Sequence, residues 1–439
     1  MAKLSADSFS EAMPAELSLF ELPPTQVAVS DATFQEIRPL SQLSGDVPIE
    51  FRISAANSLD YLDLNGSMLY VKLKLTKSDG TNLLAGDVVG PANLFLQSLF
   101  QTTEVTLQNK VTSICNHNPY IAMIQSLLKY GEDANLSQMK SQLFIKDEYD
   151  AIDDPDAAGS NGGLVERTAV VGLSKVTDLC GPIYHPFFNM SRYLLNQCDV
   201  RLKLYRSTPN FCLMTNVANP NFVVEILDVC LLVRKIKCNP GILYGHAEIL
   251  KDVNAKYPFT RTECRLQSIA SGATSFYWDS VFQGEKPAKI VVAFVETSAV
   301  SGNYKKNPFN FQNCGISEIC IYADGIPVGG APVKVNFDKT LGRTIARAYT
   351  DLFRFANKYK SDSGNDLNED DFSSGNTLFV FQLEPFYDGQ KAFINLVRTG
   401  SIRLNVQFSA PLPETMTCIV YSEAPGYFEI NNERDIITD

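Results

Sequence analysis

The residues that could perform chemistry in this chain of 439 residues are few and far apart. It has three histidines, His117, His185 and His246, and ten cysteines that include no C-x-x-C pair. Zinc sites typically use closely spaced Cys or His ligands, and a copper monooxygenase site would need more histidines than this. We therefore interpret each histidine as structural.

Two further motifs resemble catalytic signatures but lack the required context. The glycine pairs at 162–163 and 329–330 are not followed by the G-K-[ST] that a phosphate-binding loop requires. Ser126 and Lys129 match S-x-x-K, but the two leucines between them indicate a packing face of a helix. The sequence therefore predicts no catalytic residue, no cofactor and no metal.

Clusters of charged residues are the remaining candidates for ion or partner binding. Carboxylates are ligands that Ca²⁺ prefers, but neither acidic cluster follows D-x-D-x-D-G spacing, so we interpret both as solvated loop charge, with calcium binding as the alternative. The basic residues are interpreted as solvated surface, with acidic partners or DNA as the alternative. The clusters are Asp150, Asp153, Asp154 and Asp156; Asp366, Glu369, Asp370 and Asp371; Lys305 and Lys306; and Arg343, Arg347 and Arg354.

Composition indicates a folded, acidic protein. Hydrophobic residues make up 45% and charged residues 20% of the chain, which excludes wholesale disorder. The net charge of −11 argues against broad or sequence-specific binding to nucleic acid. There is no apolar run of about 18 residues, so we expect no membrane-spanning segment, and the first ten residues show no secretory signal. Scattered cysteines, several of them in apolar runs, are expected to be reduced and buried in a protein made in the cytoplasm or nucleus.

Much of the chain alternates apolar and polar residues with a period of two. The segments 69–75, 200–204 and 402–408 follow this pattern, which is typical of strands with one buried face and one solvent-exposed face. Two other runs, 222–233 and 290–295, are apolar throughout and are expected to form strands covered on both faces. Many short strands separated by polar turns predict an all-β sandwich or barrel.

Two segments, 120–132 and 341–360, instead carry apolar residues at helical spacing. Asn118 is expected to cap the first helix, with Pro119 at its first position. Both helices lead toward stretches rich in acidic residues and glycine.

These acidic stretches, 147–163 and 361–371, contain few apolar side chains. Repulsion between like charges predicts that both are solvent-exposed loops. The tip at residues 150–163 should therefore tolerate shortening.

Sequence matches in the same order indicate that the chain contains two similar β units. The pattern R-L-x-aliphatic-x-x-S-x-P occurs twice, and a P-x-N segment and a glutamate precede it in both copies. The matched pairs are Arg201 with Arg403, Pro91 with Pro308, and Glu104 with Glu318. Duplication explains this order better than chance does.

The predicted fold class is therefore all-β, with two tandem eight-stranded jelly rolls, each with a helix-bearing insertion. A unit of about 200 residues is too large for a seven-stranded immunoglobulin domain but fits such a jelly roll. The expected division is an N-terminal arm (1–30), jelly roll 1 (31–240), a linker (241–254) with a short helix, and jelly roll 2 (255–439).

Several segments carry more specific motifs, none of them catalytic. They are L-x-L-F-x-L-P-P-T-Q at 17–26, D-Y-L-D-L at 60–64, N-P-F-N-F-Q at 307–312, I-Y-A-D-G at 321–325, D-F at 371–372, and G-S-I-R-L at 400–404. With these motifs the chain resembles, over nearly its full length, the double jelly-roll major capsid proteins of eukaryotic double-stranded DNA viruses, most closely the Polinton and adintovirus-like group. Ala323 stands where that group more usually has valine.

The resemblance implies a viral major capsid protein, not an enzyme, without cofactors. It implies pseudo-hexameric homotrimers that tile an icosahedral shell around double-stranded DNA in the virion, with penton and minor capsid proteins as partners and the arm near the inner face. The alternatives are a two-jelly-roll hydrolase, an amidase or glycosidase with a carboxylate pair, and a sugar-binding lectin-like protein.

Overall fold

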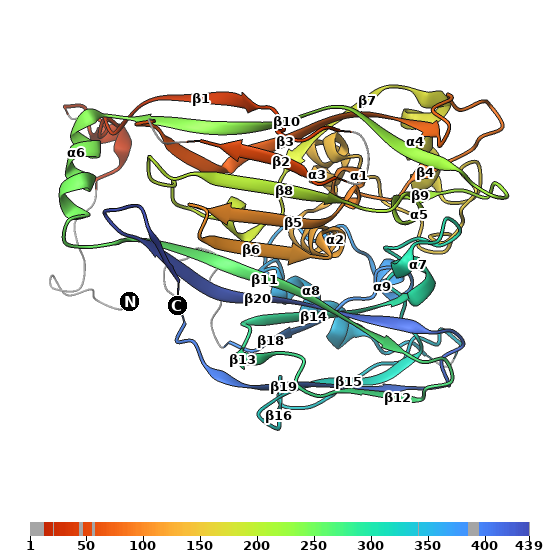
Figure 1. The fold of residues 1–439 in the computed structure, drawn as a ribbon. Coiled ribbons are helices and arrows are strands. Elements are labelled where there is room, and N and C mark those ends of the chain that lie inside the picture. Colours follow the sequence, from red (N-terminus) through yellow and green to blue (C-terminus); the bar gives the residue numbers. More distant parts are fainter. Residues whose placement is uncertain are drawn as a thin grey trace.

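The strands between residues 29 and 238 form two four-stranded antiparallel sheets. In a computed structural model, which describes residues 13–20, 22–43, 47–54, 58–340, 342–384 and 395–438, the sheet orders are β1-β10-β3-β7 and β2-β8-β5-β6 (Figure 1). The strands are β1 (Val29–Ile37), β2 (Ile49–Ile53), β3 (Tyr61–Lys77), β5 (Phe100–Leu107), β6 (Val111–Asn116), β7 (Thr177–Pro182), β8 (Val200–Arg206) and β10 (Phe222–Cys238), with a small ladder of β4 (Gly90–Pro91) and β9 (Leu213–Met214).

The strands between residues 255 and 438 repeat this arrangement, with sheet orders β11-β20-β14-β18 and β12-β19-β15-β16. In both halves the first strand pairs with the last and the second with the penultimate, as in a jelly roll. The predicted fold of two tandem eight-stranded jelly rolls is confirmed. The strands are β11 (Ala255–Ile269), β12 (Ser275–Trp278), β14 (Lys289–Glu296), β15 (Ile316–Ala323), β16 (Ile326–Pro327), β18 (Phe379–Gln382), β19 (Thr399–Phe408) and β20 (Met416–Ile430), with short β13 (Gln283–Glu285), β17 (Val333–Lys334) and β21 (Ile436–Thr438).

Shared irregularities show which residues of the two halves correspond. The β5–β8 pair has a bulge between Phe100 and Thr102, and the β15–β19 pair has one between Ile316 and Glu318. Aligning the bulges superimposes the two R-L segments as predicted. The predicted match of Glu104 with Glu318 is wrong by two residues, because Glu318 then corresponds to Thr102. A shift of two keeps a side chain on the same face of a strand, so the pattern alone could not reveal the error.

Burial follows the predicted alternation. Along residues 69–75 the side chains at odd positions are buried and those between are not, and residues 290–295 are fully buried, as predicted. The prediction for 222–233 is only partly right. Glu225 and Leu227 of β10 are exposed, so one face of this part of the strand is not covered.

Helices fill the predicted insertions, between β6 and β7 and between β17 and β18. Asn118 is the first helical residue of α2, not its cap; His117 occupies the cap position with φ +58°. The second predicted helix starts five residues later than expected, at Ala346, and Leu341 lies outside the described residues. The helices are α1 (Phe95–Ser98), α2 (Asn118–Lys129), α3 (Glu132–Leu136), α4 (Gly162–Val171), α5 (Pro209–Cys212), α6 (Pro240–Ile249), α7 (Thr297–Ser301), α8 (Ala346–Phe355) and α9 (Glu369–Ser373), with 3₁₀ turns at Ala15–Leu17, Gln138–Gln142, Gly172–Ser174 and Pro186–Asn189.

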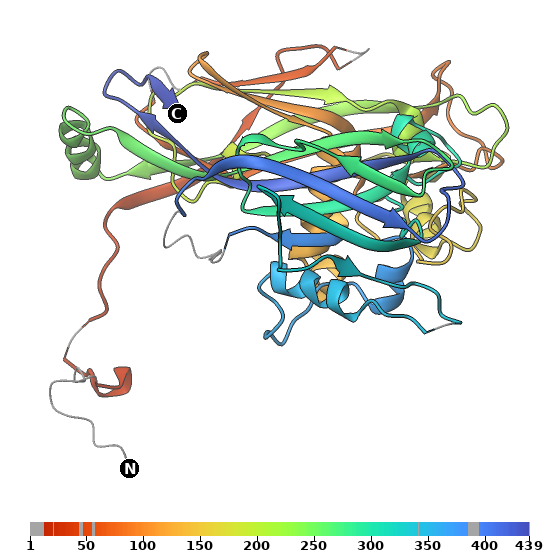
Figure 2. The same ribbon diagram turned by 90° about the horizontal axis from the view of Figure 1, so that it is seen from below.

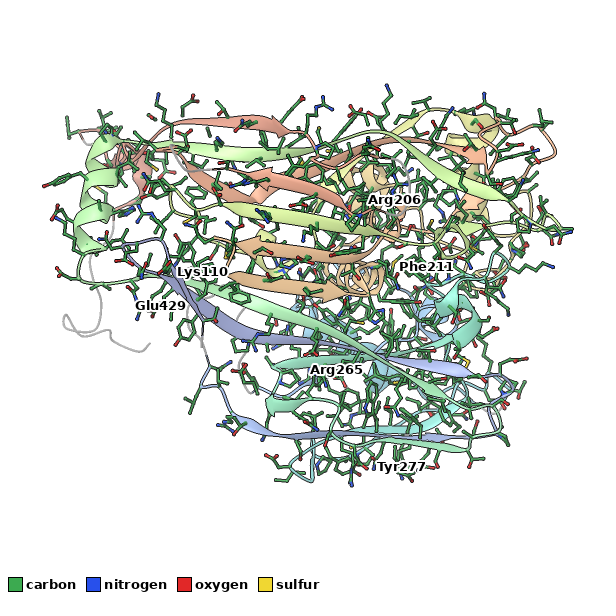
Figure 3. The ribbon with its side chains drawn as sticks, viewed as in Figure 1. Lys110, Arg206, Phe211, Arg265, Tyr277 and Glu429 are labelled. Atoms are coloured by element: carbon green, nitrogen blue, oxygen red, sulfur yellow. The ribbon has the colours of Figure 1, made fainter. Side chains whose placement is uncertain are left out.

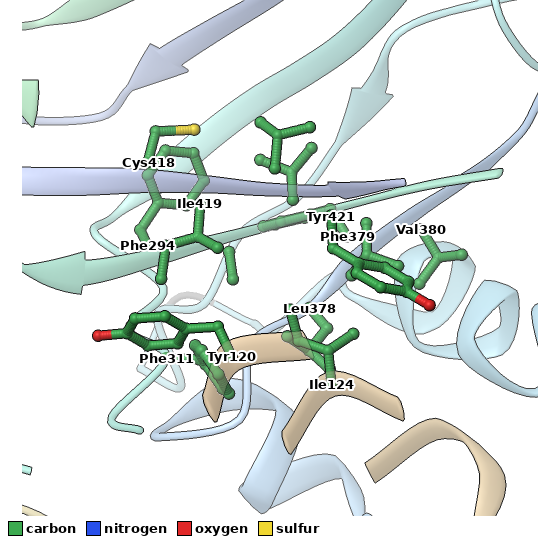
Figure 4. Packing of buried hydrophobic residues seen from close by; sticks show 14 of the residues in the cluster. Tyr120, Ile124, Phe294, Phe311, Leu378, Phe379, Val380, Cys418, Ile419 and Tyr421 are labelled. Atoms are coloured by element: carbon green, nitrogen blue, oxygen red, sulfur yellow. The ribbon is translucent and has the colours of Figure 1, made fainter. Parts of the chain in front are cut away.

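One hydrophobic core is shared by the two jelly rolls. Helix α2 of the first half packs Tyr120 and Ile124 toward Phe294, Phe379 and Ile419 of the second half (Figure 4). All five side chains are buried. The two rolls are therefore joined by a continuous apolar contact.

An ion pair joins the rolls at the opposite edge of this contact. Figure 3 shows Lys110 of the first roll and Glu429 of the second roll at the same end of the molecule. The Nζ of Lys110, on the turn between β5 and β6, lies 2.5 Å from the Oδ1 of Asp435, close to β21. Both charges are largely exposed, so we expect this pair to contribute little stability.

All ten cysteines are free, and eight of them are buried; Cys180 and Cys314 are half-buried. Burial raises the pKa of Cys418 well above that of an ordinary thiol, which keeps it protonated and unreactive. In the described ranges, no helix combines the length and apolar character needed to span a membrane.

Candidate functional site

A buried polar cluster joins the insertion of the first jelly roll to the second. Arg167, on α4, is fully buried, and its Nη2 donates to Asp147 Oδ1 at 2.6 Å. The same guanidinium donates to the carbonyls of Pro91 and Ile145. Asn307 Nδ2 then donates to Asp147 Oδ2 at 3.1 Å. The N-P-F-N-F-Q segment of the second roll is thus anchored to the first.

A second carboxylate of the same stretch holds the same segment. Asp153 accepts hydrogen bonds from the backbone N–H of Asn307 (2.9 Å) and from Asn310 Nδ2 (2.7 Å). Lys306 Nζ lies 3.8 Å from this carboxylate and 2.9 Å from Glu296. The predicted basic residue Lys306 therefore binds carboxylates of its own chain.

The prediction that residues 147–163 form a solvent-exposed loop is wrong. Asp147, Ile152, Ala157 and Asn161 are buried. The charges that should repel one another are separated by partners brought from distant parts of the chain. Shortening residues 150–163 would remove these contacts, so we no longer expect it to be tolerated.

Asp153→Ala is expected to lower the free energy of unfolding by about 2 kcal/mol, because two hydrogen bonds to a charged group are lost. Asp150→Ala, in the same loop, is the matched control. Asp150 is exposed, and its replacement should change stability by less than about 0.5 kcal/mol. Urea unfolding of both variants measures the difference, and equal losses would show that Asp153 does not join the rolls.

The second acidic stretch is also packed in part against the first jelly roll. Lys146 Nζ donates to Asp371 at 2.7 Å and lies 3.4 Å from Asp366, which accepts a hydrogen bond from Asn135 Nδ2 at 2.8 Å. Asp371 is 2% exposed. The prediction that residues 361–371 are a solvent-exposed loop is therefore wrong at its C-terminal end.

The three arginines predicted to form a helix face have different environments. Arg343 precedes α8 and pairs with Glu369 and Asp370 of its own chain, at 2.5 and 2.9 Å. Arg354 lies 3.4 Å from Asp351, and both Arg347 and Arg354 are exposed. Arg343 thus helps to neutralise the second acidic cluster.

Within the described part of the chain, no group of three or more His, Cys, Asp or Glu side chains is placed to hold a metal ion. Several members of the two acidic clusters are instead paired with cations of the same chain: Asp366 and Asp371 with Lys146, Asp153 with Lys306, and Glu369 and Asp370 with Arg343.

The three histidines lie in separate environments. His185 is buried, His117 occupies the N-cap position of α2 without a side-chain capping hydrogen bond, and His246 Nδ1 lies 2.7 Å from the hydroxyl of Tyr61. Ser126 is also buried, with its Oγ 3.1 Å from Tyr184 OH. Nucleophilic catalysis needs a base within hydrogen-bonding reach of the nucleophile, and Ser126 faces a tyrosine instead.

A buried cluster around Lys289 was not predicted from the sequence. Lys289 is 5% exposed, and its Nζ donates to the carbonyl of Phe355 at 2.9 Å and lies 4.2 Å from the centre of that ring. Tyr421 donates to Glu423 at 2.7 Å and accepts from Gln125 of α2 at 2.9 Å. These residues line a cavity of about 320 Å³ where the rolls meet. Burial lowers the pKa of Lys289 to about 8.

An acidic cleft of about 560 Å³ is a candidate active site for the hydrolase alternative. It is lined by Asp150, Asp153, Glu296 and Glu414. A glycosidase acid needs a raised pKa. Burial raises the pKa of Glu296, but hydrogen bonds from Ser298 and Lys306 outweigh it, and the pKa lies below its ordinary value. Glu296 is therefore poorly suited to donate a proton.

The two most exposed large apolar side chains of the described residues, Phe20 and Leu22, lie in the N-terminal arm. Leu19, Phe20 and Leu22 are 75%, 97% and 92% exposed. Figure 2 shows the described part of the arm leading away from the body of the molecule. An exposed apolar group of this kind is typical of a protein-interaction site.

Comparison with known proteins gives one relative by sequence. It is "Uncharacterized protein F54H12.2" of Caenorhabditis elegans, which is 24% identical over 431 residues covering 95% of this chain and 99% of the relative. No protein-family model matches the chain.

Comparison with solved structures gives several similar folds. A chain from the structure of the Sputnik virophage has a TM-score of 0.64 and 14% identity, over 98% of this chain and 93% of that chain. The mavirus major capsid protein has a TM-score of 0.55 and 12% identity, over 100% and 97%. The Faustovirus major capsid protein has a TM-score of 0.55 and 9% identity, over 96% and 95%. At these identities the likeness shows a shared fold, the double jelly roll, over nearly the whole of each chain.

Proposed function

We propose that this chain is a major capsid protein with no enzymatic activity, which assembles as homotrimers into an icosahedral shell around double-stranded DNA. The observation that carries the proposal is the fold. Two jelly rolls of the same strand order follow one another, and the likeness to solved capsid proteins extends over almost the full length of both chains.

The proposed domains are the arm (1–30), the two rolls (31–240 and 255–439) and the linker (241–254). Three chains then supply six similar rolls, which make a nearly hexagonal block. The shared apolar core and the contacts of Asp147 and Asp153 support this, because they would hold the two rolls of each chain in a fixed orientation.

The proposed location is the virion, after synthesis in the host cytoplasm or nucleus, with penton and minor capsid proteins as further partners. The free, mostly buried cysteines fit synthesis in a reducing compartment.

Light scattering on the purified full chain tests the trimer. A trimer weighs three times 48.6 kDa, or 145.8 kDa, and electron micrographs of concentrated protein should show closed shells. A monomer that persists at all concentrations would contradict the proposal, as would hydrolytic activity that a single Asp or Glu substitution abolishes.

Deleting residues 1–30 is expected to leave trimers intact and to reduce shells at least about tenfold. The arm contributes exposed apolar side chains but little to the sandwich cores, so its loss should affect contacts between trimers. Light scattering and particle counts on electron micrographs measure the two effects. If the truncated protein forms shells as well as the full chain does, the arm has no role in assembly.

A further inference from the structure

Helix α6, which links the two jelly rolls, is apolar over most of its length, yet none of its residues is buried. Tyr244 and Ile249 are 69% and 60% exposed, and Val253 just beyond the helix is 54% exposed. An apolar helix in a globular protein is normally covered. This surface therefore indicates a contact with another segment of protein.

A cavity of about 470 Å³ lies beside α6, within the ~300–1,000 Å³ typical of binding pockets. We call it the α6 pocket; its apolar lining is Tyr61, Tyr193, Leu195, Ile249, Val253 and Tyr257. The pocket is held open by hydrogen bonds. Tyr61 OH lies 2.7 Å from His246 Nδ1, and Tyr257 OH donates to the carbonyl of Tyr193 at 3.2 Å.

The charge of the α6 pocket is complementary to that of the arm. Arg192 and Lys256 line the pocket, and both are exposed; Lys256 Nζ lies 3.8 Å from Glu429, but the lining residues themselves include no carboxylate. Residues 1–30 contain one lysine and four acidic residues, a net charge of −3. Attraction between them would orient an incoming arm.

The position of the arm favours a contact with a neighbouring chain over a contact with its own body. The arm begins next to α6, because the carbonyl of Ala28 accepts from Asn239 N at 2.8 Å. From there it leads away from its own body (Figure 2), and Pro23-Pro24 keeps the chain extended. An arm that extends away from its own body can reach a neighbouring copy when copies stand side by side.

We propose that residues 17–22 of one chain dock into the α6 pocket of a neighbouring copy, with Phe20 as the apolar anchor. The inference rests on the proposed capsid function, since shell assembly is what places copies side by side. It goes further by assigning the arm a receptor on the same protein.

Disulfide trapping tests the contact directly. Full-length Leu22→Cys and full-length Val253→Cys are prepared separately, mixed in equal amounts under assembly conditions and oxidised. We expect a covalent dimer on a non-reducing gel, with the two engineered positions joined in the peptide identified by mass spectrometry. Wild-type protein and each variant alone are the controls for the native thiols. Absence of this peptide from assembled shells overturns the proposal.

A charge placed on the pocket gives a second test. Ile249→Glu is expected to form trimers but at least about tenfold fewer shells, like the arm deletion. Ile326→Glu is the matched control, because Ile326 is 70% exposed on the β15–β16 turn, away from α6. Normal shells from Ile249→Glu overturn the docking and leave the capsid function standing. Wild-type protein that forms neither trimers nor shells overturns both.

Discussion

Replacing Arg167 by methionine is expected to lower the free energy of unfolding by about 3–5 kcal/mol, the usual cost of removing one partner of a buried ion pair. The Arg167 side chain is 0% exposed and that of Asp147 is 4% exposed. Without the guanidinium, the Asp147 carboxylate stays buried with the neutral amide of Asn307, and the carbonyls of Pro91 and Ile145 lose their donor. Urea unfolding monitored by fluorescence measures the loss.

Arg38→Met is the matched control for this variant. Arg38 lies 2.5 Å from Asp228, but its side chain is 56% exposed, so we expect a much smaller loss. The double variant Arg167→Met with Asp147→Leu should be more stable than Arg167→Met alone, because no unpaired charge remains buried. Equal losses for Arg167→Met and Arg38→Met would show that the buried pair does not hold the junction.

The jelly rolls could be predicted from sequence because their strands obey a local rule. Alternation in 69–75 and 402–408 needs only one buried face, and the structure has it. The jelly-roll topology was inferred from the size of each unit, and the strand order of the structure agrees with it. The register of the repeat was less certain, since a shift of two residues between Glu104 and Glu318 leaves the same face buried.

The junction could not be predicted, because its partners are far apart in the chain. Asp153 and Asn310 are 157 residues apart, and Lys146 and Asp371 are 225 apart. Local composition describes the charge of a stretch but not the side chain that arrives to neutralise it. The burial of Lys289 could not be predicted for the same reason. A lysine that precedes an apolar strand usually marks the exposed end of that strand, and the sequence does not show which distant side chains cover it.

These junction contacts bear on the proposed assembly. A block of six rolls tiles a shell only if the two rolls of each chain keep one orientation. The apolar core around Tyr120 and Ile419 packs the two rolls together without directional bonds, while the bonds of Asp147 and Asp153 are directional. Loss of the directional contacts should therefore affect shell regularity before it affects solubility.

His185 is expected to make the protein acid-sensitive, with a loss of about 3 kcal/mol between pH 6.5 and pH 4. Burial lowers its pKa from 6.5 to about 4, and each pKa unit corresponds to about 1.4 kcal/mol. The folded imidazole is neutral, because its Nδ1 accepts from the N–H of Phe187 at 3.2 Å, and its Nε2 lies 3.2 Å from the carbonyl of Ser113. A second proton would place two donors face to face at Nδ1.

The sign follows from proton binding in the two states. Below pH 6.5 the unfolded chain binds a proton at this histidine and the folded chain does not. The free energy of unfolding therefore decreases as the pH is lowered from 6.5 to about 4, and it levels off below pH 4. His185→Asn keeps an acceptor near Phe187 and removes the titration. The difference between its unfolding free energy and that of the wild type should therefore shift by about 3 kcal/mol from pH 7 to pH 4. Parallel curves for His185→Asn and the wild type would mean that His185 accepts its proton without unfolding.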